Sequence, residues 1–184
     1  MKIRVCVVAS ALCLAGCNKG PTVELKNASG NEVAAAVKQS GVTSSNTMMQ
    51  PGEWESKTSV LEMNMPGIPA QYAARMKQGI AEHRNEASRH CIKPEDVKKP
   101  KEDFFGADKS CRYDHFTMGG GKIDVAMVCH QEQTTEKMNV SGSYTPTSYS
   151  IDTAMTGSGG EQNGMSMKMH VDAQRVGECT AKDD

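Results

Sequence analysis

The chain has 184 residues, with 21 basic and 22 acidic side chains and a net charge of −1 at pH 7. Charges of both signs are interspersed along it, which argues against a nucleic-acid-binding protein and against a polybasic membrane-binding surface. The length is enough for one domain with a substantial core and is short for two.

The first residues have the pattern of a bacterial lipoprotein signal. Lys2 and Arg4 form a basic start, and the run from Val5 to Leu14 is apolar. This run is shorter than the roughly 20 residues that a transmembrane helix needs. It ends in Leu14-Ala15-Gly16-Cys17, which resembles a lipobox, where cleavage precedes the cysteine.

We therefore expect residues 1–16 to be a signal peptide and Cys17 to be the acylated first residue of the mature protein. The protein would be anchored by lipid in the bacterial envelope and face the periplasm. Asn18 follows the cysteine, instead of the aspartate associated with retention in the inner membrane, and so favours the outer membrane. The alternative is an ordinary secretory signal with an accidental cysteine.

The segment after Cys17 is polar and has few large apolar residues. Residues 32–39 could form a short helix, but nothing in the sequence shows what such a helix would pack against. We expect residues 17–49 to be a lipidated flexible tether, residues 50–179 to be the folded domain, and residues 180–184 to be a tail.

The domain opens with a strand and a helix. The strand is predicted from Trp54 to Met65, and its apolar residues change parity at Val60-Leu61, as a β-bulge would require. Next, residues 70–88 carry an apolar stripe at helical spacing. A helical turn or two is then expected from Pro94, because proline and acidic residues suit a first turn. Further along, Phe104 and Phe105 are expected to anchor in the core.

The clearest local pattern is a β-hairpin centred on Gly120. Cys111 and Cys129 lie nine residues on either side of that glycine, so they face each other across the hairpin. This pairing leaves Cys91 to bond Cys179. Both bonds are interpreted as structural, and a redox role is the weaker alternative because there is no Cys-x-x-Cys.

Three further strands are predicted at residues 136–143, 147–155 and 165–177, separated by turn-forming residues. Consecutive strands with short connections favour a mainly β fold with a minor α part. We expect a curved antiparallel meander or partly open barrel of about six strands, one or two helices and two disulfides.

A set of short motifs within residues 50–179 points to a known family. They are Pro51-Gly52-x-Trp54-Glu55, Met65-Pro66-Gly67-Ile68-Pro69, Cys91-x-x-Pro94-Glu95-Asp96, Cys111, Val128-Cys129, Gly142, Tyr144 and Arg175-Val176-Gly177-x-Cys179. Together they resemble the family known as domain of unknown function 3617. The resemblance implies an exported proteobacterial protein, often a lipoprotein, and supports the cysteine framework. It implies no established activity, substrate or catalytic residue.

Methionine is unusually frequent, with 13 residues against three phenylalanines. Five of them form two alternating groups, which would point to one side of a strand: Met63, Met65, Met165, Met167 and Met169. Such residues are interpreted first as core packing and second as a flexible apolar ligand face. A weaker alternative is Cu(I) bound by thioethers, with nitrogen ligands from His130 and His170.

No catalytic motif is found, and the glycine-rich stretches lack the lysine and hydroxyl pattern of a phosphate-binding loop. We expect no enzyme, no cofactor, no resident metal and no nucleic-acid partner. The favoured hypothesis is a non-catalytic binding module with a Met-lined apolar face for an apolar small molecule. The alternative is an envelope protein with a filled core that contacts other proteins.

Overall fold

The computed structural model describes residues 20–42, 49–84, 87–98, 110–160 and 163–180. The predicted signal peptide over residues 1–16, the predicted acylation site Cys17, and Phe104 and Phe105 lie outside the described residues. Within the described ranges, no helix has both the length and the apolar character needed to cross a membrane.

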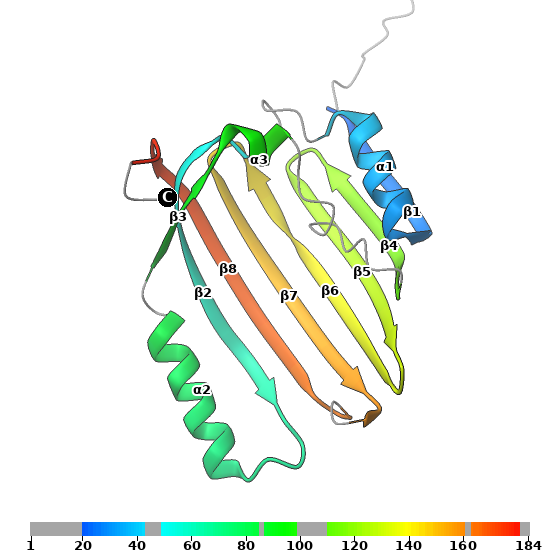
Figure 1. Ribbon diagram of the computed structural model, residues 1–184, viewed down its shortest axis with the longest axis vertical. Helices are drawn as coiled ribbons and strands as arrows, with labels where there is room; N and C mark the ends of the chain where they lie inside the picture. The colour runs from blue at the N-terminus through cyan, green and yellow to red at the C-terminus, as the bar shows by residue number, and fades with distance from the viewer. Residues whose placement is uncertain (1–19, 43–48, 85–86, 99–109, 161–162, 181–184) are drawn as a thin grey trace, which may run out of the picture.

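The domain is one open antiparallel sheet of eight strands, drawn in Figure 1 as a single broad layer. The spatial order is β1-β4-β5-β6-β7-β8-β2-β3. The strands are β1 (Thr22–Ser29), β2 (Gly52–Asn64), β3 (Ser88–Ile92), β4 (Cys111–Gly119), β5 (Lys122–Gln131), β6 (Thr134–Thr145), β7 (Ser148–Ser158) and β8 (Ser166–Gly177). This confirms the mainly β antiparallel fold, and the sheet stays open with β1 and β3 at its edges.

Strands β4 to β8 form the predicted meander, in which each strand pairs with the next. The β4–β5 hairpin turns at Gly120 and Gly121, whose φ angles are 57° and 76°. Such left-handed conformations favour glycine because it has no Cβ. Strand β2 then pairs with β8, so a segment from early in the chain completes the sheet.

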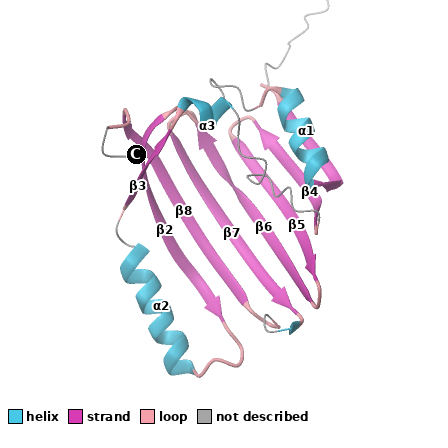
Figure 2. Ribbon diagram, viewed as in Figure 1, coloured by secondary structure: helices cyan, strands magenta, loops and turns pink. Residues whose placement is uncertain are grey.

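The β-bulge predicted in β2 is confirmed, because the register with β8 shifts between Val60 and Glu62. The predicted helix over residues 70–88 is α2 (Ala70–Arg84), which lies beside β2 (Figures 1 and 2). Its side chains Tyr72 and Met76, members of the apolar stripe, are 54% and 45% exposed. The short helix predicted from Pro94 is α3 (Pro94–Lys98).

The predicted tether over residues 17–49 is wrong where the structure describes it. β1 pairs with β4 along its length, and α1 (Gly30–Ser40) packs against both strands. Val33 and Val37 of α1 are 0% and 3% exposed. The segment looked like a tether because its apolar residues are small, yet valines and alanines fill the narrow space between a helix and a sheet.

The start and end of α1 are both encoded locally. Ser29 caps the helix in a reciprocal box, because its hydroxyl accepts from the Glu32 backbone while the Glu32 carboxylate accepts from Ser29. The Ser29 backbone N–H, and after it the Ser29 hydroxyl, donate to the Glu32 carboxylate and lower the pKa of Glu32. Gly41 ends the helix in a left-handed conformation.

The sheet has one apolar and one polar face, because successive side chains on a strand point to opposite sides. Helix α1 covers the apolar face over β1 and β4, where the hydrophobic core lies. The core residues are Val23, Ala28, Val33, Val37, Val42, Tyr113, Phe116, Met118, Val125 and Tyr144. We call the part under α1 the covered half, and the apolar face over β6, β7, β8 and β2 the second half.

Candidate functional site

Both predicted disulfides are present. Cys111 and Cys129 are directly paired across the β4–β5 hairpin with a Cα–Cα distance of 3.9 Å. The Cα atoms of Cys91 and Cys179 are 5.4 Å apart, and this bond ties β3 to the segment after β8. The four cysteines that the structure describes are thus all bonded, which leaves none of them as a thiolate for catalysis or metal binding.

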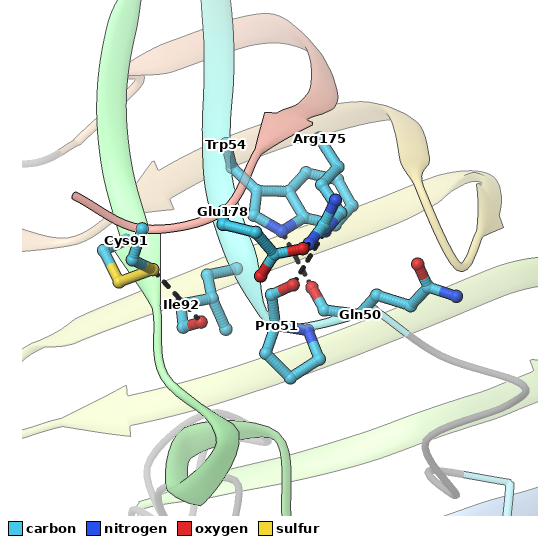
Figure 3. Close-up of a disulfide and its surroundings, with 8 residues drawn as sticks. Gln50, Pro51, Trp54, Cys91, Ile92, Arg175 and Glu178 are labelled. Atoms are coloured by element: carbon cyan, nitrogen blue, oxygen red, sulfur yellow. Dashed lines mark hydrogen bonds and ion pairs between the residues drawn. A yellow bond between two sulfur atoms is a disulfide. The ribbon is translucent and has the colours of Figure 1, made fainter.

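The residues around the Cys91–Cys179 disulfide connect the start of β2 and strand β3 to the end of β8 (Figure 3). Trp54 is 0% exposed, and its indole N–H donates to the carbonyl of Gln50 at 3.0 Å. Its ring stacks on Tyr149 of β7, with centroids 5.8 Å apart. The Nε of Arg175 donates to the carbonyl of Pro51 at 2.7 Å. Trp54 and Arg175 thus bond to backbone carbonyls just before β2, and Cys91 and Cys179 bond to each other, so these residues have a structural role.

The strongest candidate for a binding site is a row of methionines that crosses five strands. The strand register pairs each one directly with the next, from β2 through β8, β7 and β6 to β5: Met63, Met167, Met155, Met138 and Met127. Directly paired residues share a face of the sheet. All five therefore lie on the apolar face, and we call them the methionine row.

The methionine row continues into the core. Met127 pairs with Tyr113 on β4, and Tyr113 pairs with Ala28 on β1. Tyr113 is 3% exposed beneath α1, and burial raises the pKa of its phenol, which therefore stays neutral. In contrast, Met138 and Met155 are half-buried. One line of side chains thus passes from a packed core to a partly open apolar surface.

The structure places the methionines singled out in the sequence unequally. Met63 and Met167 are members of the row, and Met169 lies two residues further along β8 on the same face. Met165 and Met65 flank the ends of β8 and β2, and both are half-buried. Three of the five singled-out methionines thus share one face of the sheet, and Met127, Met138 and Met155 extend this set across further strands.

Sequence reasoning missed Met127, Met138 and Met155, because each stands alone in its own strand. The signal was available in the turns. A hairpin centre fixes which residues face each other, so the successive turn positions would have aligned these three methionines.

The structure argues against the nitrogen ligands of the copper hypothesis. His170 follows Met169 on β8 and therefore points to the opposite, polar face. His130 also lies on that face, where its Nδ1 is 3.0 Å from the Thr135 hydroxyl. What remains for a soft ion is a set of thioethers from neighbouring strands. The described residues contain no group of three or more His, Cys, Asp or Glu that could hold a metal.

The polar face contains a cluster that resembles a Ser–His–Asp triad. His170 Nδ1 is 2.7 Å from Asp152 Oδ1, and His170 Nε2 is 3.4 Å from Ser150 Oγ. A second carboxylate oxygen, Asp172 Oδ2, lies closer to Nε2, at 3.0 Å. These four residues come from adjacent positions on β7 and β8, which the sequence alone does not bring together.

Asp172 distinguishes this cluster from a catalytic triad. With a carboxylate at each ring nitrogen, the hydrogen bond to Asp152 foremost, the pKa of His170 is raised and the charged imidazolium is favoured. The Ser150 hydroxyl bonds to Asp172, which lowers the pKa of that carboxyl. A general base needs a free nitrogen lone pair, and in a triad the serine hydroxyl bonds to the histidine. In this cluster a carboxylate lies closer to Nε2 than the serine does, an arrangement that suits an imidazolium better than a general base.

An open hollow of about 460 Å³ adjoins this cluster on the polar face. Its polar lining includes Lys57, Ser143, Ser148, Ser150, Asp172 and Gln174. These side chains are those that a solvated sheet face normally carries, with opposite charges side by side. No buried polar side chain lines the hollow, since the buried residues that the structure describes include no polar or charged ones.

Comparison with known proteins identifies the family. A family model described as "Protein of unknown function (DUF3617)" matches residues 49–179, which is more than half of the chain, so the protein belongs to this family. The resemblance noted in the sequence is thereby confirmed. No curated protein and no solved structure matches significantly. The family match begins at residue 49, after β1 and α1.

Proposed function

We propose that this DUF3617 protein is a periplasmic lipoprotein, anchored to a bacterial envelope membrane through acylated Cys17, that binds the hydrocarbon part of an apolar or amphipathic molecule without catalysis. The observation that carries the binding proposal is the methionine row. It extends the apolar core across β6, β7, β8 and β2, where its side chains remain partly accessible.

The dimensions of the row suit an extended hydrocarbon chain. Neighbouring strands lie about 4.8 Å apart, so five strands make a stripe of roughly 19 Å from the first methionine to the last. The row contains no charged side chain that would have to be desolvated. Each methylene that leaves water contributes about 0.8 kcal/mol, so a chain along the row gains substantial binding energy.

Methionine also suits a ligand whose shape varies. Its side chain is unbranched and its thioether is polarisable, so it adapts to different apolar surfaces. The buried core under α1 contains more valines than any other residue, with Met118 as its buried methionine. The row methionines of β6, β7, β8 and β2 can therefore adapt to more than one occupant.

The absence of catalysis is part of the proposal. Among the described residues, the cluster around His170 is the one in which hydrogen bonds join a serine, a histidine and carboxylates, and there Asp172 lies closer to Nε2 than Ser150 does. The bonded cysteines offer no nucleophile.

A second candidate function is an envelope protein that contacts other proteins. It is favoured by four apolar side chains on and near α2 that are between 37% and 54% exposed: Leu61, Ile68, Tyr72 and Met76. Exposed apolar clusters of this kind are typical of protein interaction surfaces. In this case the methionine row would be filled by the protein itself and would bind nothing.

Ligand binding can be tested with the mature protein lacking acylation. Native mass spectrometry asks whether a lipid-sized mass co-purifies, and titration with a fluorescent fatty acid measures affinity. The variant M138S/M155S places two hydroxyls in the middle of the row. The control N139S/A154S changes the directly paired neighbours on the opposite face. We expect a large loss of affinity in the first variant and none in the control, with both remaining folded by circular dichroism.

The opposite result would favour the interaction protein. A folded wild type with no co-purifying mass and no fatty-acid binding removes the ligand proposal. Equal affinities of M138S/M155S and its control would show that the methionine row is not the site.

A further inference from the structure

We infer that the end of the sheet at which β1 begins faces the bilayer at close range. This leash end consists of residues 20–22, the β4–β5 turn (residues 119–122) and the β6–β7 turn (residues 145–147). The inference rests on the proposed acylation of Cys17. It adds which surface meets the membrane and how far the domain can move from it.

The reach of the chain limits how far Gly20 can lie from an acylated Cys17. Thr22 is paired with Gly119 in the sheet, and Gly20 lies two residues before Thr22 along the chain. From Cys17 to Gly20 the chain has three residue steps, which span at most about 11 Å when fully extended. An acylated Cys17 would therefore hold Gly20 close to the lipid headgroups. The long mobile tether expected from composition is replaced by a short one.

Hydrogen bonds join the turns of the leash end to one another and to the segment before β2. The Tyr144 N–H donates to the carbonyl of Gly121 at 2.8 Å, which joins the two turns. The Pro146 carbonyl accepts from the Gln50 N–H, also at 2.8 Å. Gly119 lies so close to Thr22 and its neighbour that an added Cβ would approach backbone atoms within 2.7 Å. Restraining Gly20 thus restrains the adjoining turns.

The described residues of the leash end include one charged side chain, the exposed Lys122. A lysine at this position suits a bilayer with anionic headgroups, because opposite charges attract. The carboxylates of Glu95 in α3 and Glu178 after β8 lie at the same end of the sheet, on the side of β8 and β2. The bilayer contact is therefore expected at the β1 side of this end, where Lys122 lies.

The orientation gives the methionine row a source of hydrocarbon. Met138 lies five residues along β6 from Ser143, the residue paired with Lys122, or about 17 Å from the leash end. The strands would run outward from the bilayer, so the second half of the apolar face starts at the membrane surface. Helix α1 projects from the apolar face over β1 and β4, so the sheet cannot lie flat on the bilayer with this face down.

Lysine footprinting of the acylated, full mature protein tests the inference. The protein is placed on vesicles of phosphatidylethanolamine with a minority of phosphatidylglycerol, and acetylation is measured by mass spectrometry. Lys122 is compared with Lys137, an exposed lysine on the same face of the neighbouring strand. Ser143, the residue of β6 paired with Lys122, lies six residues from Lys137, so the two lysines are about 20 Å apart along the strands.

We expect vesicles to slow the acetylation of Lys122 several-fold and to leave Lys137 unchanged. In the C17S variant, which cannot be acylated, vesicles should change the acetylation rate of neither lysine. A long Gly-Ser insertion between Lys19 and Gly20 should restore the acetylation of Lys122 while the protein stays on the vesicles.

The outcomes separate this inference from the function on which it rests. If intact mass shows no acyl group and the protein does not sediment with vesicles, the lipoprotein proposal and the orientation both fail. If the acylated protein sediments but vesicles slow the acetylation of both lysines to the same extent, or of neither, the orientation alone fails. Protection of Lys122 that persists with the Gly-Ser insertion would also contradict a short-tether mechanism.

Discussion

The two halves of the apolar face have similar chemistry and different cover. In the covered half, Phe116 and Met118 are 1% and 2% exposed beneath α1. In the second half, Met138 and Met155 are half-buried. The same cross-strand row passes through both halves. The comparison teaches that cover by α1 separates Phe116 and Met118 from Met138 and Met155, although all four are apolar side chains on one face of the sheet.

The disulfides test the comparison with the largest expected effect. The Cys111–Cys129 bond lies in the covered half and spans 18 residues, whereas the Cys91–Cys179 bond fastens the other edge and spans 88. Loop entropy gives upper values of about 3 and 4.7 kcal/mol for the two bonds. We expect C91S/C179S to lower the free energy of unfolding more than C111S/C129S, as measured by urea denaturation without reductant.

A reversed order would change the comparison. If C111S/C129S were the more destabilised variant, the hairpin would contribute through its packing under α1 and not through chain entropy. The covered half would then depend on its disulfide as well as on its helix.

Replacing one apolar side chain by alanine in each half of the apolar face has the next largest expected effect. Phe116→Ala removes a side chain that is 1% exposed and should cost about 3–4 kcal/mol. Met155→Ala removes a half-buried side chain and should cost about 1 kcal/mol, because less surface leaves water on folding. Thermal and urea unfolding of both variants measure the difference. Equal costs would mean that the second half is as well packed as the covered half.

Much of the fold was predictable because it is encoded locally. The glycine turn positioned Cys111 opposite Cys129, and the change of parity at Val60-Leu61 located the bulge. Both features depend on residues close in sequence. The fold class, the meander and the disulfides followed from such signals.

What could not be predicted depends on packing between distant segments. The composition of residues 17–49 predicts a tether, since the short apolar side chains of β1 and α1 indicate a folded segment only through their packing with Phe116. The edge strand β3 has five residues and no alternating pattern, and it forms by pairing with β2. The methionine row and the cluster around His170 each combine several strands, so they exist only in the register of the sheet.

The smallest expected effect concerns His170, on the polar side of the second half. Its raised pKa means that the folded state stabilises the imidazolium, so this contribution is complete below the ordinary histidine pKa of about 6.5 and is lost as pH rises through the folded value. The lowered pKa of Asp172 adds a contribution that is present above about pH 3.9 and is lost as pH falls through its folded value.

H170Q should therefore be less stable than wild type chiefly between about pH 4 and 6.5, and the gap should narrow at higher pH. Because both carboxylates are largely exposed, at 60% and 65%, we expect the gap to stay below about 1 kcal/mol and to shrink in high salt. Urea unfolding at a series of pH values measures it. A gap that widened toward alkaline pH would mean that His170 is neutral in the folded protein, and the resemblance to a catalytic triad would then need to be reconsidered.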